Sequence, residues 1–222
     1  MDGNGRWARQ RGLPRVAGHK AGAEAVRRTL QAAADAGVEA LTLYAFSSEN
    51  WRRSDEEIAD LTGLMRYYLE RELQRLLDEG VRLRLIGDYQ AFGPAMTAQL
   101  EAAVQKTAGN TRLTLAVALN YGSRRELTEA AANLARKAVA GELDPEAIDE
   151  AAIGAELDTA GLPELDLLIR TSGEVRLSNF LLWQSAYAEL LFTPLLWPDF
   201  DEQAFNDALA QFAARQRRFG GR

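Results

Sequence analysis

The sequence contains no cysteine and a single histidine, His19. Without thiols the chain can form neither a disulfide nor a metal site held by thiolates. A lone histidine cannot define a zinc site either, and the HExxH spacing of zinc proteases is absent. A protein without disulfides is at home in a reducing compartment, so we expect a cytoplasmic location.

Long uninterrupted apolar runs are missing as well. The longest apolar stretch, residues 179–197, is broken by Gln184, Glu189 and Pro194, which makes it a poor membrane span. Residues 1–20 carry charge throughout and contain no apolar core, unlike a signal peptide. We therefore expect a soluble protein whose only membrane contact would be peripheral, through an exposed apolar face.

An excess of positive charge is the third absence. The chain carries 32 acidic against 26 basic residues, a net charge of −6, which argues against a general attraction to nucleic acid. Any anion must then be bound by local basic clusters. The GxxxxGK[ST] loop of nucleotide hydrolases and the GxGxxG dinucleotide fingerprint are also absent.

The chain of 222 residues, 47% of them hydrophobic, is large enough for one domain spanning 1–222 with a substantial core. Helical patterns alternate with short apolar runs that favour strands. The helices are expected at 18–36, 55–79, 94–108, 124–140, around 145–157 and after Pro198, and the strands at 38–46, 81–87, 113–122 and 165–170. This alternation predicts an α/β fold with a central parallel sheet flanked by helices.

In such sheets ligands bind beyond the carboxyl ends of the strands. Three polar loops lie at such ends, at 46–54, 120–125 and 171–178. The first, FSSENWRRS, combines hydroxyls, a carboxylate, an amide, an indole and a guanidinium. The third contains two arginines around a glycine, which suits a phosphate, although structural salt bridges explain arginines equally well.

The opening MDGNGRW places two glycines where backbone N–H groups can face an anion, beside Asp2, which could hold a cation. A plain surface turn with a capping acid is an equally good explanation.

The first long helix is preceded by Arg15 and entered through Gly18, His19 and Lys20, so its amino end is a plausible seat for a diphosphate. Glu189 lies in an apolar stretch and should meet a metal or a cation.

Several motifs in order resemble the cis-prenyltransferase family, most closely the bacterial undecaprenyl diphosphate synthases. They are MDGNGRWA, GHKAG, LTLYAFSSENWRRS, GNTRLTLAVALNYG, IRTSGEVRLSNFLLWQSAYAEL and WPDF…RRFGG, and they cover essentially the whole chain. The resemblance implies a parallel sheet with flanking helices and a hydrophobic tunnel. It also implies magnesium-dependent condensation of an allylic diphosphate, usually farnesyl diphosphate, with successive isopentenyl diphosphates, to a polyprenyl product such as undecaprenyl diphosphate for a cell-wall lipid carrier.

Roles are implied for the residues that match the motifs. Asp2 corresponds to the catalytic aspartate that holds Mg²⁺ and assists departure of the diphosphate, Asn50 to a residue that assists proton removal, and Glu189 to a second carboxylate near the metal. The allylic diphosphate would be bound by Gly3, Asn4, Gly5, Arg6, Arg15, His19 and Arg53. The reacting ends and the prenyl chain would contact Ser47, Ser48, Glu49, Trp7 and Trp51. The isopentenyl diphosphate would contact Arg170, Arg176, Leu177 and Ser178.

Family members use the helices matching 55–79 and 94–108 as tunnel walls. Ordinary core packing remains the alternative for the individual apolar residues Ile58, Leu61, Leu64, Met65, Tyr68 and Leu69. The carboxyl-terminal R-x-G element appears as Arg218, Phe219 and Gly220. In many members this element reaches the partner's site, so a homodimer is expected.

Two further expectations qualify the resemblance. Family members have a short apolar strand immediately before the aspartate motif, whereas only Met1 precedes Asp2 here, so a first strand is expected to be missing from the sheet. The alternative functions are a noncatalytic cis-prenyltransferase-like subunit and a module that binds prenyl diphosphates without turnover. The presence of Asp2, Asn50 and Arg53 favours the enzyme.

Overall fold

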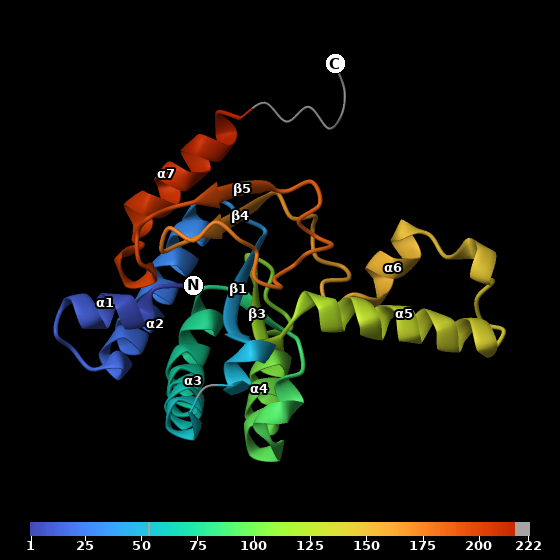
Figure 1. Cartoon of the computed structure of the whole chain (residues 1–222), viewed down its shortest axis with the longest axis horizontal. Helices are drawn as coiled ribbons and strands as arrows, with labels where there is room; N and C mark the ends of the chain where they lie inside the picture. The colour runs from blue at the N-terminus through green and yellow to red at the C-terminus, as the bar shows by residue number, and fades with distance from the viewer. Residues whose placement is uncertain (53, 216–222) are drawn as a thin grey trace.

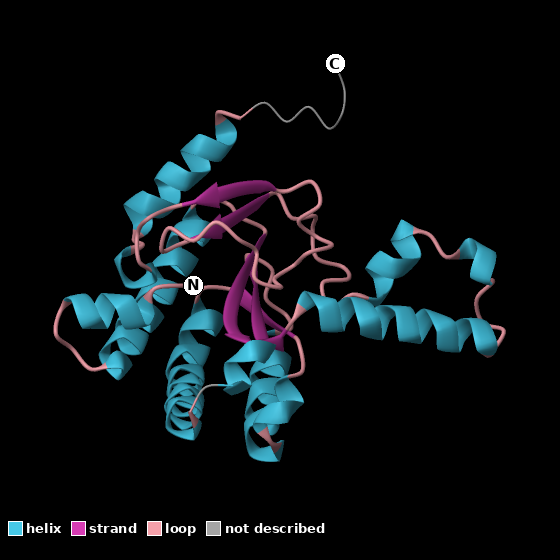
Figure 2. Cartoon of the chain, viewed as in Figure 1, coloured by secondary structure: helices cyan, strands magenta, loops and turns pink. Residues whose placement is uncertain are grey.

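The structure is a computed structural model that describes residues 1–52 and 54–215. Helices surround short strands, as Figures 1 and 2 show. The helices are α1 (Asn4–Gln10), α2 (Arg15–Asp35), α3 (Asp55–Asp78), α4 (Pro94–Thr107), α5 (Ser123–Val139), α6 (Glu150–Glu156) and α7 (Glu202–Ala213). The strands are β1 (Ala40–Ser47), β2 (Val81–Ile86), β3 (Leu113–Tyr121), β4 (Leu167–Arg170) and β5 (Glu189–Phe192).

All described strand pairs are parallel, which confirms the predicted α/β class. β3 is central in a three-stranded sheet of order β1-β3-β2, and its Val117 lies opposite Leu43 of β1 and Leu85 of β2. β4 and β5 form a second, two-stranded sheet, in which Leu167 lies opposite Glu189. The described strands therefore form two sheets instead of the single central one that the alternation predicts.

The two sheets each have a strand edge that is unpaired within the described residues, which is relevant to the first strand expected to be missing. Within residues 1–52 and 54–215, β1 has a strand on one edge only, and so does β4. Residues of both strands, including Leu43 and Ile169, line the same cavity. The backbone of Asp2 is tied to the carboxyl end of β4, because its N–H donates to Thr171 Oγ1 at 3.0 Å. The start of the described chain thus lies beside the carboxyl end of β4.

Local signals explain the helix boundaries. The Ser54 hydroxyl accepts a hydrogen bond from the Glu57 N–H at the start of α3, and α3 is followed by Gly80 at φ 68°, a conformation that glycine adopts without strain. α4 begins at Pro94, where proline costs no helical hydrogen bond. The region around 145–157 contains a short 3₁₀ turn and then α6, so it is less helical than predicted.

Helix α1 was not predicted, since the sequence there reads as a turn. It is capped by Gly3 at φ 106° and lies closely against α2. At Gly18 an added Cβ would lie 2.1 Å from the Asn4 carbonyl oxygen, so only glycine permits this approach. Tertiary packing therefore stabilises a short helix that local propensity does not favour.

The apolar interior encloses a cavity of about 1640 Å³. Helix α3 contributes several lining residues, among them Leu61, Leu64, Met65, Tyr68 and Leu69, and the sheet contributes others such as Leu85 and Leu119. The sequence left open whether six apolar residues of α3 line the tunnel or only pack in the core. Five of them line the cavity, and Ile58 does not. This cavity corresponds to the predicted hydrophobic tunnel. No described helix combines the length and the apolar character needed to cross a bilayer.

Candidate functional site

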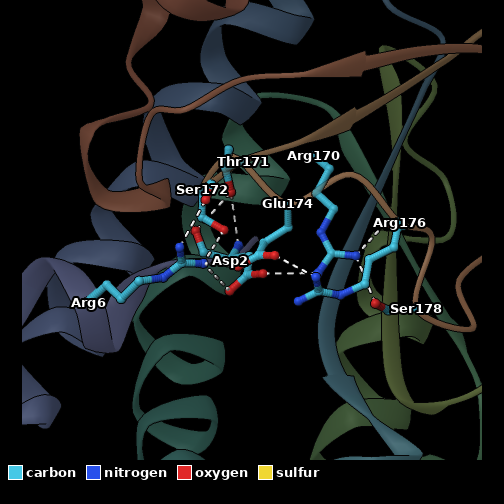
Figure 3. A network of polar contacts seen from close by, with 8 residues as sticks. All are labelled: Asp2, Arg6, Arg170, Thr171, Ser172, Glu174, Arg176 and Ser178. Carbon is cyan, nitrogen blue, oxygen red and sulfur yellow. Dashed lines mark hydrogen bonds and ion pairs between the residues drawn. The ribbon is translucent and has the colours of Figure 1, made fainter.

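A cluster of charged side chains lies where α1 meets the loop that follows β4 (Figure 3). Its members are Asp2, Arg6, Arg170, Thr171, Ser172, Glu174, Arg176 and Ser178. Three guanidiniums face two carboxylates, so the cluster carries one excess positive charge. Such a cluster attracts anions even though the whole chain is acidic.

Asp2 is fixed at both its backbone and its side chain. Thr171 Oγ1 accepts from the Asp2 N–H at 3.0 Å and donates to the Asp2 carbonyl at 2.9 Å. Asp2 Oδ2 accepts from Arg170 Nη2 at 3.1 Å, and Oδ1 lies 3.8 Å from Arg6 Nη2. Partial burial acts to raise the pKa of Asp2, but the hydrogen bond and charge of Arg170, helped by Ser172 and Arg6, lower it overall. Asp2 is therefore an ionised carboxylate at neutral pH.

Arg170 connects Asp2 with the end of the loop. Its Nη1 donates to Ser178 Oγ at 2.8 Å and to the Arg176 carbonyl, while its Nη2 binds Asp2. The side chain of Arg170 is only 15% exposed, so its charge is well shielded from solvent. The predicted residues Asp2, Arg170 and Ser178 thus form one continuous contact, although 168 positions separate the first two.

Arg6 and Arg176 share a carboxylate that the sequence analysis did not single out. Arg6 donates to the Ser172 carbonyl at 3.0 Å and to Ser172 Oγ at 2.6 Å. Its Nη2 also contacts Glu174 Oε1 at 3.0 Å, and Arg176 Nη1 donates to Glu174 Oε2 at 2.5 Å. The position of Glu174 between two arginines in IRTSGEVRLSNF is a signal that sequence reasoning could have used.

The loop after β1 lies at the same end of the sheet. Asn50 Oδ1 accepts from the Ser47 N–H at 3.0 Å, which holds the amide against its own loop. Glu49 Oε1 accepts from Asn179 Nδ2 at 2.9 Å. Burial acts to raise the pKa of Glu49, but the hydrogen bonds from Asn179 and from its own loop lower it overall.

Trp51 and Asn120 link that loop to the carboxyl end of β3. The Trp51 indole N–H donates to Asn120 Oδ1 at 2.7 Å, and its ring centroid lies 5.2 Å from that of Phe46 and 5.3 Å from that of Phe92. Phe46 and Phe92 line the cavity, and Trp51 packs against both of them. Asn120 was missed by sequence reasoning, and its φ of 48° marks a backbone conformation that asparagine tolerates better than most residues.

Most predicted site residues line the cavity of about 1640 Å³. They are Asp2, Gly3, Asn4, Gly5, Arg15, His19, Ser47, Asn50, Arg170, Arg176, Leu177 and Ser178. Arg15 also pairs with Glu57 at 2.8 Å. Six others are not lining residues, namely Arg6, Trp7, Ser48, Glu49, Trp51 and Glu189. Arg53, Arg218, Phe219 and Gly220 lie outside the described residues.

Trp7 is held by contacts away from the cavity lining. Its indole N–H donates to Asp199 Oδ1 at 2.6 Å, and the Arg11 guanidinium lies 4.2 Å from the ring centroid. These contacts hold the ring on the outer side of α1, so it fixes α1 against the turn at 197–199. The structure does not bring Trp7 to the cavity that a prenyl chain would enter.

Within this chain the structure does not bring Glu189 to Asp2. Glu189 begins β5 opposite Leu167, whereas Asp2 is bound beyond the far end of β4, so the two carboxylates lie at opposite ends of the small sheet. Glu189 does meet a cation, as its apolar stretch predicts, because its Oε2 accepts from Arg215 Nη1 at 2.6 Å. Among the described residues no three acidic or histidine side chains gather into a metal site.

A hard cation such as Mg²⁺ does not need three protein ligands. Mg²⁺ is usually held by one or two carboxylates together with phosphate oxygens of a substrate. Asp2 fits that requirement, because its carboxylate is ionised, 41% exposed and a lining residue of the cavity.

Comparisons with known proteins agree with this arrangement. The profile of a family described as "Putative undecaprenyl diphosphate synthase" matches residues 1–220. An "Isoprenyl transferase" of Agrobacterium fabrum is 58% identical over 220 residues, covering 99% of this chain and 89% of the relative. A "Ditrans,polycis-undecaprenyl-diphosphate synthase ((2E,6E)-farnesyl-diphosphate specific)" of Shewanella oneidensis is 53% identical over 99% of this chain and 80% of its own.

A solved structure shows the same fold. The crystal structure of lavandulyl diphosphate synthase from Lavandula x intermedia, in complex with dimethylallyl diphosphate, superimposes with a TM-score of 0.94. The two sequences are 34% identical, and the match covers 99% of this chain and 95% of the solved one. The architecture described above is therefore that of prenyl diphosphate enzymes.

Proposed function

Because the chain belongs to the undecaprenyl diphosphate synthase family of cis-prenyltransferases, and so is a prenyltransferase, we propose that it extends farnesyl diphosphate with successive isopentenyl diphosphates. The product is a polyprenyl diphosphate, undecaprenyl diphosphate for a cell-wall lipid carrier. One observation carries the proposal: a cluster of three guanidiniums and Asp2 borders a largely apolar cavity of about 1640 Å³, with Asp2, Arg170 and Arg176 in its lining. That combination fits a substrate with a charged head and a long hydrocarbon tail.

The reaction breaks the bond between the allylic carbon and its diphosphate oxygen. The allylic carbon bonds to the terminal alkene carbon of isopentenyl diphosphate, which leaves a cation on the adjacent branched carbon. A proton then leaves the CH2 group on the other side of that cation, and the electron pair of the broken C–H bond forms the new double bond. Negative charge grows on the leaving diphosphate, and cations that are already fixed in position stabilise it without reorganising. Arg6 and Arg170 are such cations, since Ser172 holds the first and Ser178 and Asp2 hold the second.

The two diphosphates would occupy neighbouring positions in this cluster. The allylic diphosphate would contact Arg6 and the backbone of Gly3, Asn4 and Gly5, with Arg15 and His19 nearby in the cavity wall. The isopentenyl diphosphate would contact Arg170, Arg176 and Ser178. Asn50, held by the Ser47 N–H, would order the reacting ends for loss of the proton.

Asp2 is the residue that would hold Mg²⁺, together with oxygens of the substrate. When bound, the ion supplies Lewis-acid neutralisation of the departing diphosphate. The chain itself contributes an ionised carboxylate, kept in place by Thr171 and Arg170.

We further propose a cytoplasmic homodimer that acts on prenyl diphosphates, binds no nucleic acid and contacts a membrane only at its surface. Two sequence features support this part: the net charge of −6 and the terminal motif at 218–220, which in many family members reaches a partner subunit.

The direct test is to incubate the protein with farnesyl diphosphate, labelled isopentenyl diphosphate and Mg²⁺, measuring released diphosphate and separating the products by length. We expect labelled polyprenyl diphosphates and one diphosphate released per isopentenyl unit. Binding of both substrates without diphosphate release would contradict an enzyme and favour the binding module. Activity that appears only with a second, different subunit would favour the noncatalytic subunit.

A further inference from the structure

Glu174 joins two arginines that the proposed function gives to different substrates. Its Oε1 contacts Arg6 Nη2 at 3.0 Å, and its Oε2 accepts from Arg176 Nη1 at 2.5 Å, so each oxygen engages a separate guanidinium (Figure 3). A diphosphate bound to either arginine would use the same N–H groups, because carboxylate and phosphate oxygens accept from guanidiniums in the same way.

We propose that the Glu174 carboxylate lies where a phosphate oxygen would contact Arg6 and Arg176, so that a diphosphate binds by displacing it and is expelled when it returns. This inference rests on the proposed function and assigns Glu174 a role in releasing inorganic diphosphate after each condensation. An enzyme that extends a prenyl chain repeatedly must release inorganic diphosphate after every condensation. A carboxylate of the protein that competes for the same arginines lowers the affinity of the site for that diphosphate.

The contacts of Arg6 support displacement without loss of the site. Besides Glu174, Arg6 donates to both the carbonyl and the hydroxyl of Ser172. Ser172 is 6% exposed and has a φ of 77°, a conformation that a serine keeps only where its surroundings fix it. Its own N–H donates to the Leu195 carbonyl at 2.7 Å. Arg6 therefore stays oriented when Glu174 leaves.

Glu174 is placed where it can move. It lies in a loop, directly after Gly173 at φ 73° and before Val175, which is 73% exposed. The Glu174 side chain is itself 26% exposed, and within residues 1–52 and 54–215 its polar contacts are with the two guanidiniums. Its swing into solvent would thus break no contact of the apolar interior.

The test is calorimetric titration with inorganic pyrophosphate in magnesium buffer, comparing the wild-type chain with Glu174→Gln. We expect the variant to bind pyrophosphate about 3- to 10-fold more tightly, up to about 1.4 kcal/mol. Pyrophosphate should inhibit condensation by the variant at correspondingly lower concentration. Asp35→Asn is the matched control, because Asp35 also pairs with an arginine, Arg112, which lies just before the amino end of β3. This substitution should leave the affinity for pyrophosphate unchanged.

Equal or weaker pyrophosphate binding by Glu174→Gln would overturn the inference, because the carboxylate would then merely hold the arginines in place. Glu174→Asp, one methylene shorter, keeps the charge but cannot span both guanidiniums, and we expect an intermediate affinity. Thermal unfolding of each variant shows whether the fold is intact. Condensation by the wild-type chain is measured on the same preparation, which separates this inference from the proposed function. If the wild-type chain condenses its substrates but Glu174→Gln binds pyrophosphate with wild-type affinity, displacement by Glu174 is wrong and the proposed function stands.

Discussion

Single hydrogen bonds decide what several residues of this protein can do. Burial acts to raise the pKa of Asp2, but Arg170, helped by Ser172 and Arg6, lowers it overall. Ser172, a serine with a left-handed backbone, is one of the residues that orient Arg6. The opposite case is Glu126, which is 4% exposed and accepts from the Tyr121 hydroxyl at 2.6 Å and from the Asp158 N–H. Its hydrogen-bond partners in the described part of the chain include no cation, and burial raises the pKa of Glu126.

The raised pKa of Glu126 predicts a pH dependence of stability. A carboxyl whose pKa is higher in the folded state stabilises the fold fully below the unfolded pKa of about 4.3 and loses that contribution as the pH rises through the folded value. Glu126→Gln mimics the protonated form. The free energy of unfolding is measured with urea between pH 4 and pH 8. As the pH rises over this range, we expect the wild-type chain to lose more stability than Glu126→Gln, and the difference should be about 1.4 kcal/mol for each unit by which folding raises the pKa of Glu126. Parallel pH profiles would contradict this explanation.

Asn179 provides a second prediction at this scale. Its Nδ2 donates to Glu49, its Oδ1 accepts from the Arg124 N–H at 2.8 Å, and its φ is 63°. Asn179→Asp keeps the acceptor but places a negative charge beside Glu49. We expect kcat/KM for condensation to fall about 10-fold, which corresponds to about 1.4 kcal/mol. Asn133→Asp, on the body of α5, is the control, and equal activity of the two variants would remove Asn179 from the site.

At the scale of elements, hydrophobic periodicity was sufficient for the long segments and failed for the short ones. The predicted helix at 55–79 is α3 within one residue, because its apolar positions repeat over several turns. The seven residues of α1 lack that signal, and their helix depends on the contact of Asn4 with Gly18. β5 was hidden in a longer apolar stretch, where periodicity does not separate strand from loop.

The same distinction explains which site residues motif matching could not place. Motif matching found Asp2, Arg170 and Ser178, which the fold brings into contact. It could not foresee that Glu189 and Asp2 lie at opposite ends of a four-residue strand pair, because that depends on register. Nor could it place Trp7, whose partner Asp199 is 192 positions away.

Helix α3 supports a prediction about product length. It runs from the loop after β1 toward β2, so Leu61 is nearer to the charged cluster than Leu69 is, and both line the cavity. Leu69→Trp would fill part of the cavity away from Asp2. We expect shorter products at a stability cost of about 1–3 kcal/mol from overpacking, read by chromatography of the labelled products.

Ala59→Trp serves as the control for that substitution. Ala59 lies on the same helix but is exposed, so the added indole should leave both product length and stability close to those of the wild-type chain. A product distribution that is the same for Leu69→Trp and the wild-type chain would show that the cavity does not hold the growing chain.

At the scale of the whole molecule, the chain combines an acidic surface composition with one basic cluster at an apolar cavity. Residues from both ends of the sequence build this cluster, since Asp2 and Arg6 meet the segment 170–178. The site therefore exists only when the entire chain is folded, which fits the match of the family profile over residues 1–220.

The proposed homodimer makes a prediction at this scale. Light scattering should give about twice the chain mass of 24.5 kDa. Deleting residues 217–222 should raise the KM for isopentenyl diphosphate about 10-fold, equivalent to about 1.4 kcal/mol, and change the KM for farnesyl diphosphate much less. An unchanged KM for both substrates would show that the terminal element does not serve the site.

The most direct test of the account is the rate of condensation by Asp2→Ala compared with the wild-type chain, with thermal unfolding measured on both. If Asp2 is the carboxylate around which both diphosphates are bound, turnover should fall at least about 10²- to 10³-fold while the unfolding midpoint stays close to that of the wild-type chain. Wild-type turnover by a folded Asp2→Ala protein would contradict the central claim.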